Sequence, residues 1–441
     1  MSVPLHVSSA ETEKSCDSSE KSQHHTEKFD TTTTSCSQVE KARGYRSLSS
    51  WVEHFLLRKF LTVSGECPIQ VVLWDGWELD PTANSSLPTV RILDRHTLWR
   101  LLIHPHYQFM EAYAQGRLKV DGDLTSVVGN LLQLVRVTGG PPRRKVFPQI
   151  PRMKSDLARV NRRNVHHHYD LSNVFYRLWL DEQLLYTCAY FSAEDLTLES
   201  AQIAKMDHIC RKLRLRSGEM VIEAGCGWGA LALHMARHYG VRVRAYNLSR
   251  EQLQYARDRA QAEGLTGQVE FIEDDWSNIR GQCDAFVSVG MLEHVGPENF
   301  PQLGKILQQI LRPQSRALIH TIGQNLPEPL NPWIKHRIFP GAQPPTLSQM
   351  MEFLQPSGFT VWDVENLRPH YAKTLKHWLD RFETAAENIR TMFDDVFVRT
   401  WRMYLASSKA AFDTGELELY QVLFAPSSFN GWPATRTELY Q

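Results

Sequence analysis

The sequence lacks the features that mark several special classes of protein. Its 441 residues hold seven cysteines, an odd number without paired metal-binding spacing, which argues against a zinc module or a disulfide framework and favours a reducing compartment. No run approaches the roughly 20 apolar residues of a membrane-spanning helix, and the polar, acid-containing N-terminus is unlike a signal peptide. The net charge is zero, so no overall field attracts nucleic acid. We therefore expect a cytoplasmic protein that does not bind nucleic acid.

Composition divides the chain into segments. Residues 1–45 are rich in Ser, Thr, Glu and Lys and are predicted to form a disordered tail. Residues 46–138 predict a small N-terminal α+β domain, with strands at 69–74 and 89–93 and helices near 97–103, 107–113 and 124–134. Residues 139–163 form a basic linker, which either contacts an anionic membrane surface or only separates two domains. Residues 427–441 are expected to be a C-terminal tail.

The stretch 219–230 contains the most informative pattern. A short apolar run at 220–222 predicts a buried parallel strand, which ends in an acid, Glu223. Three alternating glycines follow before a helical pattern begins at Leu231. Such glycines let the chain turn tightly and approach a ligand closely, and the helix then points its first N–H groups at that ligand. Further strands are expected at 241–246, 269–272, 285–289 and 317–320, which predicts a doubly wound α/β sheet with ligands at the carboxyl ends of its strands.

The residues around the glycines favour one ligand over another. A dinucleotide site needs an acid at the end of the next strand to hold a ribose, but here that strand ends in Asn247, Leu248 and Ser249. The acid precedes the glycines instead, at Glu223, where it can face a cationic amino-acid group. This favours S-adenosylmethionine (SAM) over NAD. The alternative is a glycine-rich turn that binds nothing.

Helical periodicity is clear on both sides of this region. A helix is expected over 198–213, with Ile203, Met206, Ile209, Cys210 and Leu213 on its inner side. Aromatic residues between 378 and 404 recur at helical spacing and predict either core or an apolar ligand channel.

Several polar residues are candidates that also have ordinary structural explanations. Glu293 and His294 follow a predicted strand and fit either a catalytic pair or a structural hydrogen bond. His320 alone fits a core histidine, and Cys188 lies between aromatic residues, where most cysteines are inert. The histidines at 166–168 have no partner at metal-ligand spacing, so no metal site is predicted.

A series of motifs resembles one known family. In chain order they are His167–Asp170, Tyr186–Tyr190, Gly225–Gly229, Gly290–Gly296, His320–Gly323, Ile338–Gly341 and His370–Tyr371. Together they resemble the bacterial cyclopropane-fatty-acyl-phospholipid synthases, which are SAM-dependent methyltransferases, over about residues 50–425. The resemblance implies a class I SAM methyltransferase fold at 164–426. The related mycolic-acid cyclopropane synthases lack the small N-terminal domain, which favours a phospholipid substrate.

The resemblance also implies a reaction and a set of site residues. The methyl group of SAM is added across a cis double bond of a phospholipid acyl chain, and a bound bicarbonate ion takes a proton as the cyclopropane ring closes. Trp276 is expected to flank the adenine, Asp275 to accept from its amino group and Gln252 to bind the ribose, while Glu223 stands where the family usually has Asp. The implied catalytic residues are Cys188, Glu293, His320, Ile322 and Tyr371. The implied cofactor-binding residues are Tyr186, Thr187, Glu223, Gly225, Cys226, Gly227, Leu248, Gln252, Asp275 and Trp276.

Partners and alternatives follow from the same resemblance. The expected partners are unsaturated phospholipids at the inner face of the membrane, with which the protein associates peripherally, and a homodimer is possible. One alternative keeps the substrate and the cofactor but yields a methylene or methyl-branched fatty acid. Another is a non-catalytic membrane-surface protein on the same fold. A small-molecule methyltransferase does not explain the N-terminal domain or the basic linker.

Overall fold

The computed structural model describes residues 48–62, 69–79, 87–137 and 172–437. The predicted tail at 1–45, the basic linker and the histidines at 166–168 lie outside these residues. The chain forms two compact units, 1–53 and 54–441, and the elements below belong to the second unit, except that α1 (Leu48–Thr62) crosses the division.

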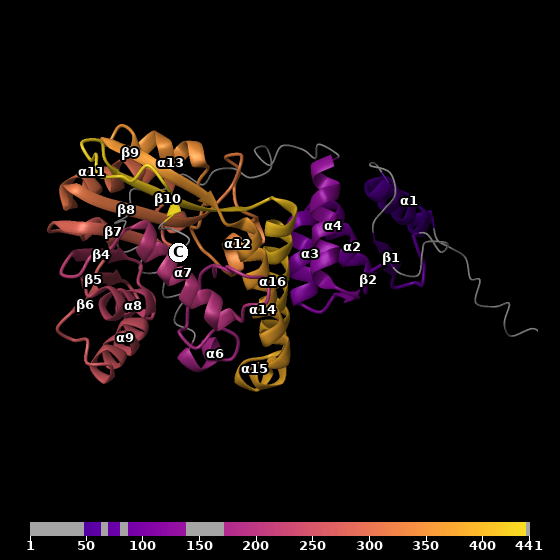
Figure 1. The fold of residues 1–441 in the computed structure, drawn as a ribbon. Coiled ribbons are helices and arrows are strands. Elements are labelled where there is room, and N and C mark those ends of the chain that lie inside the picture. The colour runs from indigo at the N-terminus through magenta and orange to yellow at the C-terminus, as the bar shows by residue number, and fades with distance from the viewer. Residues whose placement is uncertain (1–47, 63–68, 80–86, 138–171, 438–441) are drawn as a thin grey trace, which may run out of the picture. The chain divides into compact units, whose positions relative to one another are not determined.

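A seven-stranded sheet carries the larger part of the fold (Figure 1). Its strand order is β6-β5-β4-β7-β8-β10-β9, in which β10 runs antiparallel to both of its neighbours and the strands from β6 to β8 are parallel. The five strands that the sequence predicted are confirmed, whereas β9 and β10 were not predicted. The strands are β4 (Met220–Ala224), β5 (Arg242–Asn247), β6 (Val269–Glu273), β7 (Cys283–Val289), β8 (Leu311–Gly323), β9 (Phe359–Asn366) and β10 (Glu418–Pro426).

Alternate residues of these strands enter two separate cores. Val221 and Val243 belong to the core on one face of the sheet, and Ile222 and Phe286 belong to the core on the other, as the period of two in a strand requires. Helices α7 (Leu198–Lys212), α8 (Ala230–Tyr239) and α9 (Arg250–Ala262) cover the first face, and α11 (Phe300–Ile310) and α13 (Leu347–Leu354) cover the second (Figure 1). The sheet is therefore buried on both sides and fixes the ends of its strands firmly.

Helix α7 turns a polar set of side chains inward. The prediction that Ile203 lies on the inner side was wrong, because this residue is 45% exposed. Lys205, His208 and Lys212 are buried instead. Met206, Ile209 and Cys210 are buried as predicted, so the helix carries apolar and polar residues on the same buried face.

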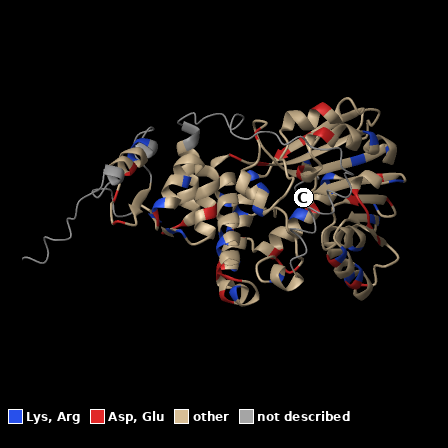
Figure 2. Ribbon diagram, turned by 180° about the vertical axis from the view of Figure 1, so that it is seen from behind, with Lys and Arg blue, Asp and Glu red and all other residues tan. Residues whose placement is uncertain are grey.

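Aromatic residues dominate the helices beside the sheet. Trp179, Trp378 and Trp401 are buried and meet edge to face, so the aromatic stripes form core, as one of the two interpretations predicted. These helices are α6 (Asn173–Arg177), α10 (Leu292–Val295), α12 (Pro332–Arg337), α14 (Arg368–Thr384), α15 (Ala386–Met392) and α16 (Asp395–Thr414), with short 3-10 turns η3 (Trp276–Asn278) and η4 (Pro297–Asn299). Figure 2 shows charges of both signs interspersed along α14 and α16.

A second, three-stranded sheet forms the small region. It joins β1 (Gln70–Leu73), β2 (Thr89–Ile92) and β3 (Leu118–Asp121), with β1 parallel and β3 antiparallel to β2. The predicted strands and helices of this region are confirmed, whereas β3 was not predicted. The helices are α2 (Arg95–Ile103), α3 (Pro105–Ala114) and α4 (Leu124–Val137). Glu111 of α3 accepts a hydrogen bond from Trp333 Nε1 of α12 at 2.9 Å and pairs with Arg337.

Within the described ranges, no helix has the length and apolar character needed to cross a membrane.

Candidate active site

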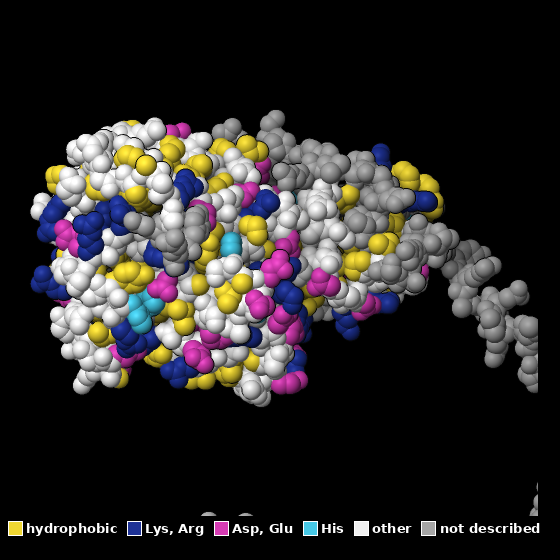
Figure 3. Space-filling model, viewed as in Figure 1, with side chains coloured by type: hydrophobic (Ala, Val, Ile, Leu, Met, Phe, Trp, Pro, Cys, Tyr) yellow, Lys and Arg dark blue, Asp and Glu magenta, His cyan; other side chains and the backbone are white. Residues whose placement is uncertain are grey.

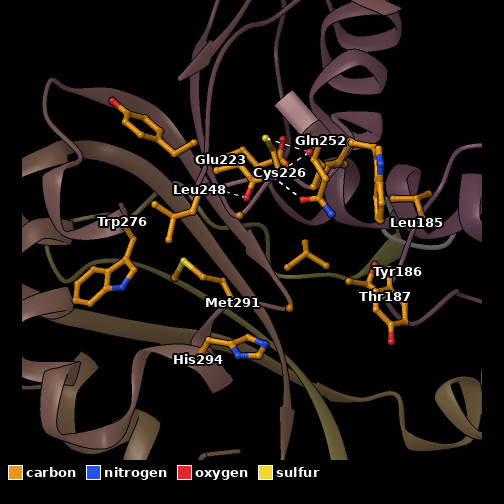
Figure 4. Close-up of a pocket in the computed structure, with 18 of the residues that line it drawn as sticks. Leu185, Tyr186, Thr187, Glu223, Cys226, Leu248, Gln252, Trp276, Met291 and His294 are labelled. Carbon is orange, nitrogen blue, oxygen red and sulfur yellow. Dashed lines mark hydrogen bonds between the residues drawn. The ribbon is translucent and has the colours of Figure 1, made fainter. Parts of the chain in front are cut away.

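A cavity opens at the carboxyl ends of β4, β5 and β7, where a doubly wound sheet binds its ligands. It encloses about 1340 Å³ of free space, counting its mouth, which is enough for a nucleoside-sized ligand together with part of a second one. Figure 4 shows Trp276 on one side of this space and Tyr186 and Thr187 on the other. All ten predicted cofactor-binding residues line it: Tyr186, Thr187, Glu223, Gly225, Cys226, Gly227, Leu248, Gln252, Asp275 and Trp276.

The glycine loop has the geometry that its sequence demands. Gly225 and Gly229 have φ angles of 86° and 81°, a region that favours glycine. A side chain at Gly229 would also come within 2.8 Å of Ala256 Cβ on α9. The backbone N–H groups of Gly225 and Cys226 donate to Tyr246 O at 2.9 and 3.1 Å. The loop is thus closed against β5 and leads directly into α8.

The end of β5 is ordered by side-chain amides. Asn247 Nδ2 donates to Gln252 Oε1 at 2.8 Å and to Gly227 O at 3.2 Å, and Asn247 Oδ1 accepts from Leu248 N. Gln252 is therefore held in the cavity wall by the asparagine that stands where a dinucleotide site would have its acid.

The turn after β6 presents an acid and an aromatic ring. Asp275 is 1% exposed and its Oδ1 accepts from Ser277 N at 2.9 Å, which caps the η3 turn. Trp276 is buried, and its Nε1 has no hydrogen-bond partner among the described residues. A buried donor without a partner costs free energy, so this indole N–H is available to a ligand.

The end of β4 holds an acid that has no direct partner. Glu223 is 2% exposed, and its buried Oε2 accepts no hydrogen bond from the part of the chain that the structure describes. Burial raises the pKa of this carboxyl to about 8, against a smaller opposing effect of Lys205. The carboxyl faces the cavity near Cys226 (Figure 4).

The five predicted catalytic residues lie behind the cavity wall rather than in it. Glu293 Oε2 accepts from Thr321 Oγ1 at 2.7 Å, and Oε1 accepts from Ile322 N at 3.5 Å. Burial raises the pKa of Glu293 to about 7, although these neutral donors oppose the rise. Gly290 separates this carboxyl from the cavity, because a side chain there would lie 3.0 Å from Thr187 Cγ2 and 4.0 Å from Glu293 Oε1.

His320 is fixed by the neighbouring strand. It pairs in register with Gln421 of β10, whose Nε2 lies 3.1 Å from His320 Nδ1. An amide nitrogen only donates, so Nδ1 accepts and the ring proton is on Nε2. Burial lowers the pKa of His320 well below its usual value, and its Nε2 is buried without a partner among the described residues. The ring therefore offers one free neutral N–H donor.

Cys188 and Tyr371 meet a common neighbour on α14. Ala189 N donates to Thr374 Oγ1 at 3.0 Å, and Tyr371 lies one turn before Thr374 on the same helix. Burial raises the pKa of Cys188 far above its usual value, so this thiol stays protonated. Thr187 connects the two groups of residues, since it precedes Cys188 and contacts Gly290.

Sequence reasoning missed several residues of the cavity wall. Met291 and Phe339 line it, whereas His294, which the sequence did single out beside Glu293, also lines it, and burial lowers the pKa of His294 to about 4. Lys205 of α7 lines it as well. A signal existed for Lys205, because it lies seven residues before Lys212 and four before Ile209, within the buried helical stripe. The described residues contain no cluster of three or more His, Cys, Asp or Glu side chains that could hold a metal ion.

Known proteins agree with this geometry. A family model described as mycolic acid cyclopropane synthetase matches residues 157–422. A probable fatty acid methyltransferase of Pseudomonas putida is 35% identical over 387 residues, covering 85% of this chain and 96% of that protein. The cyclopropane-fatty-acyl-phospholipid synthase of Escherichia coli K12 is 37% identical over 270 residues, covering 61% of this chain and 69% of the synthase.

A solved structure adds the cofactor. The mycolic acid cyclopropane synthase CmaA1 in complex with SAH and CTAB is 30% identical, with a TM-score of 0.58 over 60% of this chain and 98% of that one. The fold expected from the sequence is thereby confirmed as that of class I SAM methyltransferases. The chain belongs to the mycolic acid cyclopropane synthetase family and is a SAM-dependent methyltransferase of the cyclopropane-fatty-acid-synthase type.

Proposed function

We propose that this protein converts a cis double bond in a phospholipid acyl chain into a cyclopropane ring, using the methyl group of SAM. The methyl carbon becomes the third ring carbon, S-adenosylhomocysteine (SAH) leaves and one proton is released. The observation that carries this proposal is a cofactor-sized cavity whose wall at Thr187 and Gly290 adjoins the buried carboxyl of Glu293. His320, whose buried Nε2 has no partner among the described residues, precedes on β8 the threonine that donates to this carboxyl.

The cavity suits SAM because its polar groups match the parts of that molecule. When bound, SAM supplies an electrophilic methyl group on a sulfonium centre. Glu223, whose Oε2 is unpartnered, is placed to bind the cofactor's ammonium group. The unpartnered Nε1 of Trp276 and the ordered amide of Gln252 are placed to hold the adenosine end. Glu223 Oε2 and Trp276 Nε1 are polar atoms that the described residues leave without a hydrogen-bond partner.

The residues behind the wall suit a small anion such as bicarbonate. When bound, bicarbonate supplies a base in a site from which water is excluded. His320 would hold it through its Nε2–H, and Glu293, with its raised pKa, would donate a proton as a neutral carboxyl. Ile322 N, Tyr371 and Cys188 complete the proposed set. A buried anion needs several such donors to offset its lost hydration.

The region before the methyltransferase domain supports a phospholipid substrate. The family model matches residues 157–422, which leaves the three-stranded sheet and its helices outside that match. Helix α2 exposes Trp99 and Ile103 to solvent beside Arg100. An exposed aromatic and aliphatic pair next to a cation suits the surface of an anionic bilayer. In Figure 3, hydrophobic side chains over the large sheet lie in small groups among charged ones. We place the protein at the cytoplasmic face of the membrane.

A methylene or methyl-branched product is the second candidate. It is favoured by the relative named a probable fatty acid methyltransferase, which aligns with 85% of this chain, more than the cyclopropane-fatty-acyl-phospholipid synthase does. The cyclopropane and methylene products start from the same cofactor and the same double bond and differ only in which proton is lost, whereas a saturated methyl branch also requires a separate reductant that supplies two hydrogens.

Product analysis tests the proposal. The purified protein is incubated with SAM and vesicles of a monounsaturated phospholipid, and the fatty acids are examined by mass spectrometry and NMR. A gain of CH2 with loss of the olefinic protons supports cyclopropanation. The same gain with new vinylidene protons would establish the second candidate. No gain, with SAM bound, would contradict a phospholipid substrate. Light scattering of the same sample tests the possible homodimer.

A further inference from the structure

Helix α7 carries a buried lysine that folding alone does not explain. Lys205 is 1% exposed and lies deep in the inner face of the helix. Its only hydrogen bond within the described residues runs from Nζ to Thr187 Oγ1, at 2.8 Å. No carboxylate among those residues lies within ion-pair distance of Nζ. Isolated buried cations are costly, so this ammonium calls for a partner that the described residues do not provide.

The same cavity contains an acidic side chain. Lys205 and Glu223 both line it, and each influences the pKa of the other, yet they form no ion pair. Burial lowers the pKa of Lys205 to about 8, which Asp181 and Glu223 oppose. A basic and an acidic side chain that face one cavity without pairing with each other are complementary to a zwitterion, whose ammonium group favours the ionised form of the acid.

The surroundings of Lys205 suit a role at the cofactor. Thr187, which accepts from its Nζ, is one of the cavity residues, and its main-chain oxygen accepts from Gln202 Nε2 of α7 at 2.9 Å. Gln202 also donates to Leu185 O at 3.2 Å. Helix α7 therefore holds the cavity wall at 185–187 through the side chains of Gln202 and Lys205, and the ammonium group of Lys205 lies at this wall.

We propose that Lys205 binds the α-carboxylate of the methionine part of SAM while Glu223 binds the α-ammonium. The hydrogen bond to Thr187 leaves two N–H groups of Lys205 for the carboxylate. Together the two contacts favour a cofactor that carries both an α-ammonium and an α-carboxylate group over one that lacks either group. The proposal rests on SAM as the cofactor and is independent of the lipid product.

The binding affinities of three ligands distinguish a role of Lys205 in binding the carboxylate from a purely structural role. SAH has both charged groups, decarboxylated SAH keeps only the amine, and 5′-methylthioadenosine lacks both. In Lys205→Met we expect SAH to bind roughly tenfold to hundredfold more weakly, because a charge-assisted hydrogen bond is lost. The two ligands without a carboxylate should bind as to the parent, or more tightly. Calorimetric titration of the full chain measures all three.

Two further variants make the test decisive. Lys212→Met removes another buried lysine of α7 that does not line the cavity, and it should leave all three affinities unchanged. Lys205→Gln keeps a donor for Thr187 but no charge, and it should show the same selective loss of SAH binding. An equal loss for all three ligands, or normal SAH binding by Lys205→Gln, would overturn the proposal. Failure of the parent to bind SAH would overturn the cofactor assignment as well. Circular dichroism verifies that each variant is folded.

Discussion

The two buried lysines of α7 have opposite surroundings. Lys212 lies 2.6 Å from Glu365 Oε2 and 3.2 Å from Asp363 Oδ2 of β9, and His208 Nε2 lies 2.8 Å from the same Glu365 oxygen. Among the described residues, Lys205 has only the hydroxyl of Thr187 as a hydrogen-bond partner, and it lines the cavity. The lysine at the C-terminal end of the helix is thus neutralised within the fold, whereas the lysine in the middle of the helix is left for a ligand. Buried charge is structural at the first position and functional at the second.

Three carboxyls, the half-buried Glu365 and the buried Glu293 and Glu223, extend this comparison. Burial opposes the charge of Glu365, but His208 and Lys212 lower its pKa to about 2. Burial raises the pKa of Glu293, which has only neutral donors, to about 7. Burial raises the pKa of Glu223, which has no direct partner, to about 8. The protonation state follows the partner rather than the depth of burial.

The largest effect is expected for Glu293→Gln. Turnover should fall on the order of 10²–10⁴-fold, because this residue belongs to the proposed base site. SAH affinity should stay near that of the parent, since Glu293 does not line the cavity. Single-turnover product formation and calorimetry measure the two quantities. A loss of SAH affinity in this variant would contradict the separation between cofactor and base.

Lys212→Met should be the most destabilising change. Removing the cation breaks its ion pairs with Glu365 and Asp363, which keep His208 and Arg436 as neighbours, at a cost of up to about 3 kcal/mol in the free energy of unfolding. Because the pKa of Glu365 is lowered from 4.5 to about 2, the pair stabilises the fold above pH 4.5 and loses this effect as pH falls toward 2. Urea unfolding at pH 7 and pH 3 should therefore show a smaller difference from the parent at pH 3. An equal difference at both values would exclude the ion pair as the cause.

Glu223→Gln should stabilise the ligand-free protein while weakening SAH binding. The raised pKa of Glu223 means that the fold holds a proton which the unfolded chain releases, so the parent loses stability as pH rises from 4.5 through about 8. The amide does not ionise, which removes this cost and gains on the order of 2 kcal/mol at pH 8. Thermal melting across this range measures the effect. A parallel pH profile in parent and variant would show that Glu223 is ionised throughout.

The last prediction concerns the basic linker, which lies outside the described residues. Neutralising Arg143, Arg144 and Lys145 of the basic linker should weaken binding to anionic vesicles by about 1 kcal/mol per charge. The weakening should shrink as salt is added. Vesicle sedimentation tests this prediction, and unchanged binding by the triple variant would make the segment a simple linker.

The sequence predicted the cavity better than the sheet edge or the buried charges. Glycines, a strand-end acid and strand periodicity are local signals, so Gly225, Glu223 and Trp276 are found at the expected ends of strands. Strand β10 was missed because a continuously buried run looks the same in a strand and in a core helix. Lys205 was missed because a lysine on a helix usually extends to solvent. Its burial depends on tertiary packing.

The pairing of His320 with Gln421 has a consequence for the order in which the protein matures. Strand β10 is translated after every other strand of the large sheet, yet it is inserted between β8 and β9. The strands that frame the cofactor cavity are complete more than a hundred residues earlier. A chain emerging from the ribosome can therefore assemble a place for the cofactor first, and the histidine acquires its fixed tautomer only when β10 arrives.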